Sequence, residues 1–167
     1  MYNELTEVDI KKMKEELTYR SVELRPKLSD DVKEARSLGD LSENAEYRSA
    51  KRAFCRNESR IRYLEKMIRT AKVISIDSNP DEVGLFDRIT IYDEDAGETE
   101  EITLSTMTRL DLKNGVICKD SAFGKAILGK KVGDRVLIQA SEDYSYYIVI
   151  KNIVKGYDDE SIPLMEY

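Results

Sequence analysis

The sequence predicts an α+β protein, with an N-terminal hairpin of two long helices followed by a small antiparallel-sheet domain. Three observations lead to this fold class. Up to about residue 72, apolar residues recur three or four positions apart, as they do on one face of a helix. Further on they alternate with polar residues, as in strands. Between the two helical stretches lies Gly39, a residue that can close a helix.

The first helical stretch carries one apolar stripe and ends at Gly39. The stripe consists of Ile10, Met13, Leu17, Leu24, Leu28, Val32 and Ala35. Thr6, followed by Asp9, resembles an N-cap with an acidic partner at its N3 position. Pro26 lacks a backbone donor, so we expect an irregularity or kink in this helix.

The second helical stretch carries a stricter heptad seam, typical of a coiled coil. The seam consists of Tyr47, Ala50, Phe54, Asn57, Ile61, Leu64, Ile68 and Ala71. Because the connection between the helices is short, they should be antiparallel. Asn57 places an amide in the seam, where such a residue fixes the register at some cost in stability. At about 1.5 Å per residue, helices of about 30 residues extend roughly 45 Å.

Three segments follow from these patterns. Residues 1–75 form the hairpin, residues 76–155 form the globular domain, and residues 156–167 have no periodicity and read as a mobile tail. The domain contains one short helix, about Ala122 to Leu128, among short strands. The expected strands are Val73–Ile76, Arg88–Tyr92, Glu101–Leu104, Val116–Cys118, Arg135–Ile138 and Tyr144–Val154.

Composition excludes several kinds of chemistry. The 167 residues include no histidine, which rules out Ser-His or Cys-His catalysis and zinc bound by histidine. Neither GxxxxGK[ST] nor GxGxxG occurs, so nucleotide binding by those loops is unsupported. Cys55 and Cys118 lie in different halves without metal-ligand spacing and are expected to be reduced thiols. No signal peptide or long apolar span is evident, so we expect a cytoplasmic protein without a membrane partner.

Charge is distributed unevenly along the chain. The formal net charge is −6, but residues 1–75 hold 17 Lys and Arg against 14 Asp and Glu, while residues 76–167 hold 10 against 19. Nine of the basic residues lie between Arg48 and Lys72, with only Glu58 and Glu65 among them. This basic stretch would favour contact with nucleic acid or an acidic wall, although a solvated helix face explains it equally well.

The turn between the helices reads Gly39-Asp40-Leu41-Ser42-Glu43-Asn44-Ala45-Glu46-Tyr47. Asp40 and Glu43 have the spacing of a capping box at the start of the second helix. Alternatively, both carboxylates extend from the end of the hairpin as oxygen ligands for Mg²⁺. Two carboxylates alone make a weak Mg²⁺ site, so such a hairpin would complete a metal site in a partner's active centre.

Two motifs resemble those of a known family. GDLSENAEYxxAK follows a long helix, and SxxGKAxLGKKVGD precedes a strand. Both are similar to motifs of the bacterial transcript cleavage factors of the GreA/GreB family, and the similarity extends from Leu5 to about Val154. The resemblance implies a coiled-coil hairpin and an FKBP-like C-terminal domain. It also implies a monomer that is not itself an enzyme. Its partner would be bacterial RNA polymerase, whose secondary channel admits the hairpin, with the RNA 3′ end of a backtracked complex close by.

The resemblance also assigns roles to residues at the hairpin end. Asp40 and Glu43 would help to hold the second catalytic Mg²⁺, which polymerase shares and which the chain does not bind alone. Arg36 and Lys51 match basic positions near the extruded RNA, and Leu41, Ser42 and Asn44 form the tip loop. A phosphate contact by Arg36 or Lys51 would be independent of sequence.

The chain departs from the family's pattern at three places. The segment before Asn114-Gly115 reads Thr108-Arg109-Leu110-Asp111-Leu112-Lys113 in place of an acidic turn, Ser121-Ala122-Phe123 replaces Ser-Pro-hydrophobic, and the tail runs past the usual end. Polymerase docking is therefore expected to differ in detail. The rival hypothesis is a paralogue that enters the same channel and regulates or inhibits polymerase without cleavage, although the intact Asp40 and Glu43 pair argues against it.

Overall fold

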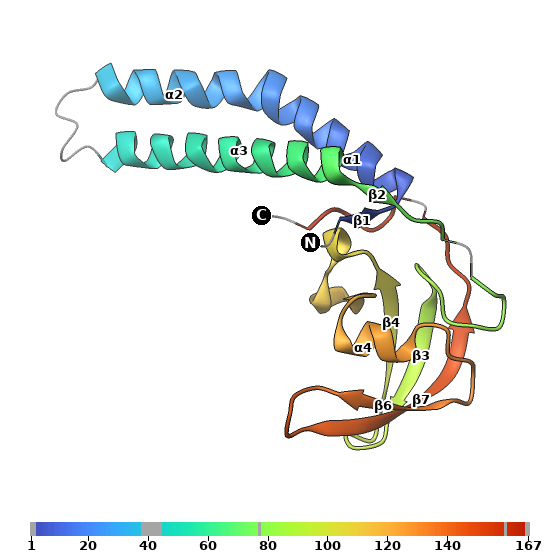
Figure 1. Ribbon diagram of the computed structural model, residues 1–167. Helices are drawn as coiled ribbons and strands as arrows, with labels where there is room; N and C mark the ends of the chain where they lie inside the picture. The colour runs from blue at the N-terminus through green and yellow to red at the C-terminus, as the bar shows by residue number, and fades with distance from the viewer. Residues whose placement is uncertain (1–2, 38–44, 77, 159, 166–167) are drawn as a thin grey trace. The chain divides into compact units, whose positions relative to one another are not determined.

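The computed structural model describes residues 3–37, 45–76, 78–158 and 160–165 (Figure 1). These residues form two compact units. One is Asp9–Lys72, and the other combines Met1–Val8 with Val73–Glu166.

The Asp9–Lys72 unit is a helical hairpin, as the sequence predicts. Its first arm consists of α1 (Glu7–Thr18), a π-helical turn (Tyr19–Leu24) and α2 (Arg25–Ser37), and its second arm is α3 (Ala45–Thr70). α2 and α3 lie side by side (Figure 1). The fully buried apolar side chains of the seam come from both arms, namely Met13, Ala35, Ile61, Leu64 and Met67.

The irregularity expected at Pro26 takes the form of the π-helical turn. Proline cannot donate to the carbonyl four residues back, and its ring crowds that carbonyl. Immediately before Pro26, the Arg25 N–H donates to the Arg20 carbonyl, five residues back. A π turn is wider than an α turn and accommodates one extra residue. The extra residue therefore rotates the side chains of α2 about the helix axis, relative to the positions that a continuous α-helix would give them.

The second unit contains a five-stranded sheet in the order β5-β4-β3-β7-β6 (Figure 1). Its strands are β3 (Arg88–Asp93), β4 (Glu98–Ser105), β5 (Val116–Cys118), β6 (Arg135–Gln139) and β7 (Ser145–Val154). The short helix α4 (Ala122–Ile127) contributes the fully buried Ile127 to the core. The remaining core residues are Val83, Ile89, Ile91, Ile102, Leu104, Val136, Ile138, Ile148 and Ile150.

The sheet differs from the expected antiparallel sheet at one edge. β5 runs parallel to β4, with Val116 opposite Thr103, whereas the other pairs are antiparallel. Two 3-10 turns, Met107–Arg109 and Leu112–Asn114, lie between β4 and β5. They bring the chain back before β5 begins, so no hairpin forms. A strand of three residues carries no sequence signal for its direction.

The ends of the chain also differ from the expected segments. Residues 3–8 cluster with the sheet rather than with the hairpin, and β1 (Glu4–Leu5) pairs with β2 (Lys72–Val73). The expectation of a mobile tail is wrong for its first described residues, because the Gly156 N–H donates to Asp87 at 3.0 Å and Asp158 is buried in an ion pair. Further along, the Met165 N–H donates to the Thr108 carbonyl at 2.7 Å.

Candidate functional site

The sequence places the candidate site at the turn of the hairpin. Asp40, Leu41, Ser42, Glu43 and Asn44 lie outside the described residues, so the structure tests neither their role as ligands nor their role as a cap. The described helices on either side end at Ser37 and begin at Ala45.

Arg36 and Lys51 lie on the two arms that flank this turn. Arg36 is in the last turn of α2 and Lys51 is in the second turn of α3, and both are exposed. The Lys51 ammonium lies 5.8 Å from the centroid of the Tyr47 ring, a cation–π contact. Within the described part of the chain neither side chain is in an ion pair.

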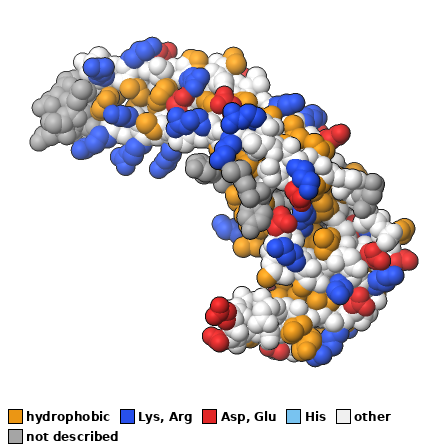
Figure 2. All heavy atoms as spheres, in the orientation of Figure 1, with side chains coloured by type: hydrophobic (Ala, Val, Ile, Leu, Met, Phe, Trp, Pro, Cys, Tyr) orange, Lys and Arg blue, Asp and Glu red, His pale blue; other side chains and the backbone are white. Residues whose placement is uncertain are grey.

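The basic stretch of α3 is mostly a surface feature. Eight of its nine members are exposed, and Figure 2 shows Lys and Arg side chains gathered along the hairpin. The exposed members are Arg48, Lys51, Arg52, Arg56, Arg62, Lys66, Arg69 and Lys72. Arg60 is the exception, since only 6% of it is exposed. This surface could attract a polyanion without any base-specific contact.

Arg60 belongs to a polar cluster inside the seam that sequence reasoning found only in part. Glu16 accepts two bonds from Arg60, Nε–Oε1 and Nη2–Oε2, each 2.8 Å, and a third from Arg20 Nε at 2.6 Å. Asn57, 2% exposed, accepts from Arg20 Nη1 at 3.2 Å and donates to the Arg20 carbonyl at 3.3 Å. We call Glu16, Arg20, Asn57 and Arg60 the seam cluster. In the sequence, the cluster could have been recognised from Glu16 and Arg20, two charged residues at helical spacing from members of the apolar stripe.

Electrostatics confirm that the charges of the seam cluster are matched. Burial alone would raise the pKa of Glu16, but hydrogen bonds and charge from Arg60 and Arg20 outweigh it and hold the pKa below its usual value. One residue beyond Asn57, Glu58 forms a two-bond ion pair with Arg25 at 2.5 Å. That pair also joins the arms but is more exposed, and it lowers the pKa of Glu58 through the hydrogen bonds from Arg25.

The sheet unit holds a second buried ion pair, between Arg109 and Asp158. Their side chains are 1% and 3% exposed, with Nη1–Oδ1 at 2.5 Å and Nη2–Oδ2 at 2.9 Å. The Thr6 hydroxyl donates to Asp158 at 2.6 Å and accepts from Arg109 at 3.3 Å. The guanidinium also lies 5.1 Å from the centroid of the Phe86 ring. Two departures from the family's pattern, the Arg109 segment and the longer tail, are thus bonded to each other.

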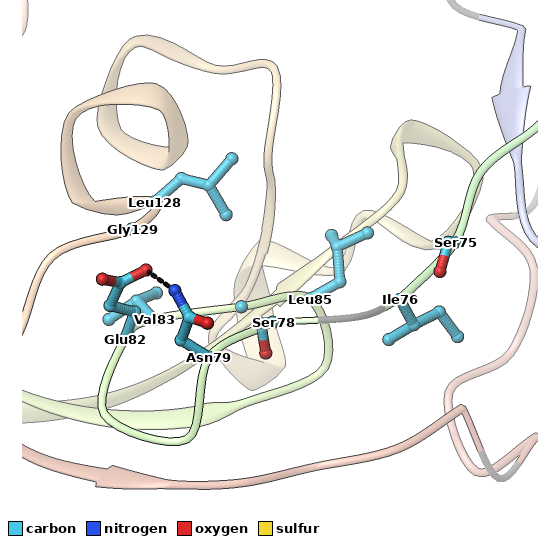
Figure 3. A pocket seen from close by; sticks show the side chains of 10 residues that line it. Ser75, Ile76, Ser78, Asn79, Glu82, Val83, Leu85, Leu128 and Gly129 are labelled. Carbon is cyan, nitrogen blue, oxygen red and sulfur yellow. Dashed lines mark hydrogen bonds between the residues drawn. The ribbon is translucent and has the colours of Figure 1, made fainter.

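A pocket of about 460 Å³ lies beside the loop that precedes β3 (Figure 3). Leu128 and Gly129 form one side, and Asn79 donates to Glu82 at 2.8 Å on the other. The Lys155 ammonium holds this loop, since it donates to Ser78 at 2.7 Å and to the buried Asp87 at 2.6 Å. Within the described lining, Glu82 is the one ionisable side chain, and it is already hydrogen-bonded.

Two structural features are absent from the described residues. No group of three or more Cys, Asp or Glu side chains there is arranged to hold a metal ion. None of the described helices is both long and apolar enough to cross a membrane.

The chain is similar to known proteins along most of its length. Residues 3–73 match the GreA/GreB N-terminal family, described as "Transcription elongation factor, N-terminal", and residues 76–153 match "Transcription elongation factor, GreA/GreB, C-term". Transcription elongation factor GreA of Bacillus licheniformis is 43% identical over 136 residues, which cover 81% of this chain and 86% of that protein. The GreA protein of Thermotoga maritima is 37% identical over 146 residues, 87% of this chain and 94% of its own.

Among solved structures, GreA factor homolog 1 (Gfh1) of Thermus thermophilus is 21% identical, with 91% of this chain and 98% of that chain covered and a TM-score of 0.40. The two family matches together span nearly the whole chain, and the order of hairpin and sheet unit agrees with them. The chain belongs to the GreA/GreB family of transcription elongation factors.

Proposed function

We propose that this chain enters the secondary channel of RNA polymerase and stimulates the polymerase's own cleavage of backtracked RNA 3′ ends. The observation that carries the proposal is the acidic motif with Asp40 and Glu43 at the turn of the hairpin in a chain that belongs to this family. The factor itself is not an enzyme in this proposal, because the active centre is shared with polymerase.

The donor set of the turn fits Mg²⁺ as a shared ion. Asp40 and Glu43 offer hard carboxylate oxygens, the ligands that Mg²⁺ prefers, but too few for octahedral coordination. The remaining ligands would come from polymerase carboxylates, RNA phosphate and water. Paired metal ions in such centres activate water and stabilise the leaving oxygen of a phosphodiester. The two carboxylates would help to hold the second ion and orient the attacking water.

Arg36 and Lys51 would assist by contacting the extruded RNA. Both side chains are exposed, Arg36 in the last turn of α2 and Lys51 in the second turn of α3, and neither has an ion-pair partner among the described residues. Phosphate contacts position a nucleic acid without reading its sequence, as a factor that acts on any arrested transcript requires.

The test uses a stalled, backtracked elongation complex with 3′-labelled RNA and Mg²⁺. The wild-type chain should release short labelled 3′ fragments, while Asp40→Asn and Glu43→Gln should nearly abolish release and still compete with the wild type for polymerase. Glu46→Gln is the matched control, because Glu46 is an exposed acid in the first turn of α3 that the proposal does not use.

Two outcomes would contradict the proposal. Binding of the wild type without fragment release would favour the channel-occupying regulator. Full cleavage by Asp40→Asn would return Asp40 to a capping role, for which Asp40→Ala should lower stability by roughly 0.5–2 kcal/mol.

A further inference from the structure

The seam cluster lies where the first arm is least regular. The π-helical turn spans Tyr19–Leu24, and Arg20, within it, is bonded to Asn57 on α3 through both its carbonyl and its guanidinium. Glu16, one turn earlier, is joined to Arg60 by two hydrogen bonds. The cluster therefore ties the end of α1 and the start of the irregular turn to one place on α3.

An apolar seam alone would not define that place strongly. Heptad seams of apolar residues can pair in more than one register, and a single buried amide is the best-attested device that selects one. Here the amide has two specific partners on a single residue of the opposite arm. A shifted register would leave Asn57 and Arg60 buried without these partners, which is unfavourable for both groups.

The register matters for whatever the hairpin carries at its turn. A slip of one residue moves one helix about 1.5 Å along its axis and rotates it by about 100°. Catalytic groups must be held to within about 0.5 Å, and a displacement of about 1 Å can reduce a rate about 100-fold. Even the smallest slip between α2 and α3 would therefore misplace residues attached to their ends.

We propose that Glu16, Arg20, Asn57 and Arg60 are positioning residues, which fix the register of the hairpin and thereby deliver Asp40 and Glu43 to the shared centre. The fixed register stands by itself, whereas the delivery of Asp40 and Glu43 rests on the proposed function. The cluster acts through the helices and touches neither RNA nor metal. Its role is specificity of register rather than gain of stability.

Asn57→Leu separates these two roles. Leucine fills the seam with an apolar side chain, and Arg20, whose side chain is 28% exposed, can turn its freed donor to water. The thermal stability of the hairpin should therefore be unchanged or higher, while its register loses specificity. A residue that served stability alone would give the opposite result.

The register of the two arms can be measured as the distance between two spin labels, one on each arm. Cys55 on α3 is exposed and accepts one label, Lys33→Cys on α2 accepts the second, and the buried Cys118 is replaced by Ala. In the wild-type background we expect one narrow distance. In Asn57→Leu we expect a shifted or additional distance, because each residue of slip moves a label about 1.5 Å along the helix axis and about 100° around it.

The same variants are compared in the cleavage assay at saturating protein. Asn57→Leu should compete normally for polymerase and lower the cleavage rate about tenfold or more. Glu58→Ala is the matched control, since it removes a cross-hairpin ion pair one residue away that is more exposed. That variant should retain one distance and the wild-type rate.

The results decide the proposal in each case. An unchanged single distance in Asn57→Leu would overturn it, as would a shifted distance with a wild-type cleavage rate. If the wild type itself stimulates no cleavage, the proposed function fails, and the distances still decide whether Asn57 fixes the register.

Discussion

Removing the carboxylate of Asp158 should strongly destabilise the sheet unit. This is notable because Asp158 lies in residues 156–167, which the sequence pattern predicts to be a mobile tail. Asp158→Ala leaves Arg109, with its side chain 1% exposed, without its counter-charge and without two hydrogen bonds. Breaking a buried ion pair by removing one partner typically costs about 3–5 kcal/mol. The remaining contacts of Arg109 with Thr6 and Phe86 place the expected loss near the lower end, at about 3 kcal/mol.

That loss is large for a unit of this size. Folded domains are stable by about 5–15 kcal/mol, and about 1 kcal/mol shifts the melting temperature of a small domain by about 4–8 °C. We therefore expect a decrease of roughly 12–24 °C in the transition of the sheet unit. Hydrogen exchange of buried core amides, such as those of Ile89 and Ile148, reports the unfolding free energy of this unit separately from the hairpin.

Two controls test the physical reason. Arg109→Met with Asp158→Leu removes both charges, and such replacements of buried pairs are often neutral or stabilising, so stability should largely recover. Glu94→Ala breaks the exposed pair with Arg135 and should change stability little. If Asp158→Ala melts like the wild type, or if the double variant is no more stable than the single one, then an unpaired buried charge is not what the pair prevents.

Three further outcomes are expected. Gly156→Ala should destabilise the sheet unit by about 1–3 kcal/mol, measured by urea unfolding, because a Cβ there would lie 1.7 Å from the Phe86 carbonyl oxygen. The pKa of Glu16 is lowered in the folded state, so its carboxylate contributes to the free energy of unfolding above the unfolded pKa of about 4.3. This contribution is lost as the pH falls through the folded-state pKa. The melting temperature of Glu16→Gln, measured as a function of pH, should therefore lack this acid-dependent decrease. Arg36→Ala and Lys51→Ala should weaken cleavage in a salt-dependent manner, and an effect independent of ionic strength would indicate packing against polymerase instead.

The sequence predicted the elements that are defined by local periodicity. The stripes of the two arms and the alternation in β3, β6 and β7 each reflect one buried face, and one face is enough to define a period. Pro26 correctly marked an irregularity, but a missing donor does not say whether the helix bends or widens. The π-helical turn is also bonded across the seam, through Arg20 to Asn57.

Ion pairs between residues far apart in the chain could not be predicted from the sequence. Arg109 and Asp158 are 49 positions apart, and neither lies in a periodic segment that would place it next to the other. Each was noted only because it lies where the chain departs from its family's pattern. The role of Asp40 and Glu43 has a similar limit, because their spacing is that of a cap and the family resemblance alone favours a ligand.

The two buried ionic clusters serve different needs because the two units are stabilised differently. The sheet unit has a core built from four strands and α4, so the Arg109 and Asp158 pair can attach the tail to an already stable body. The hairpin has a single seam, in which every buried polar group takes the place of an apolar contact. Polar residues are retained there at a cost in stability, and a cost of this kind is justified where one register must be selected over others. Stability and register in the hairpin should therefore respond in opposite directions to apolar substitution at Asn57, whereas in the sheet unit loss of Asp158 should affect stability first.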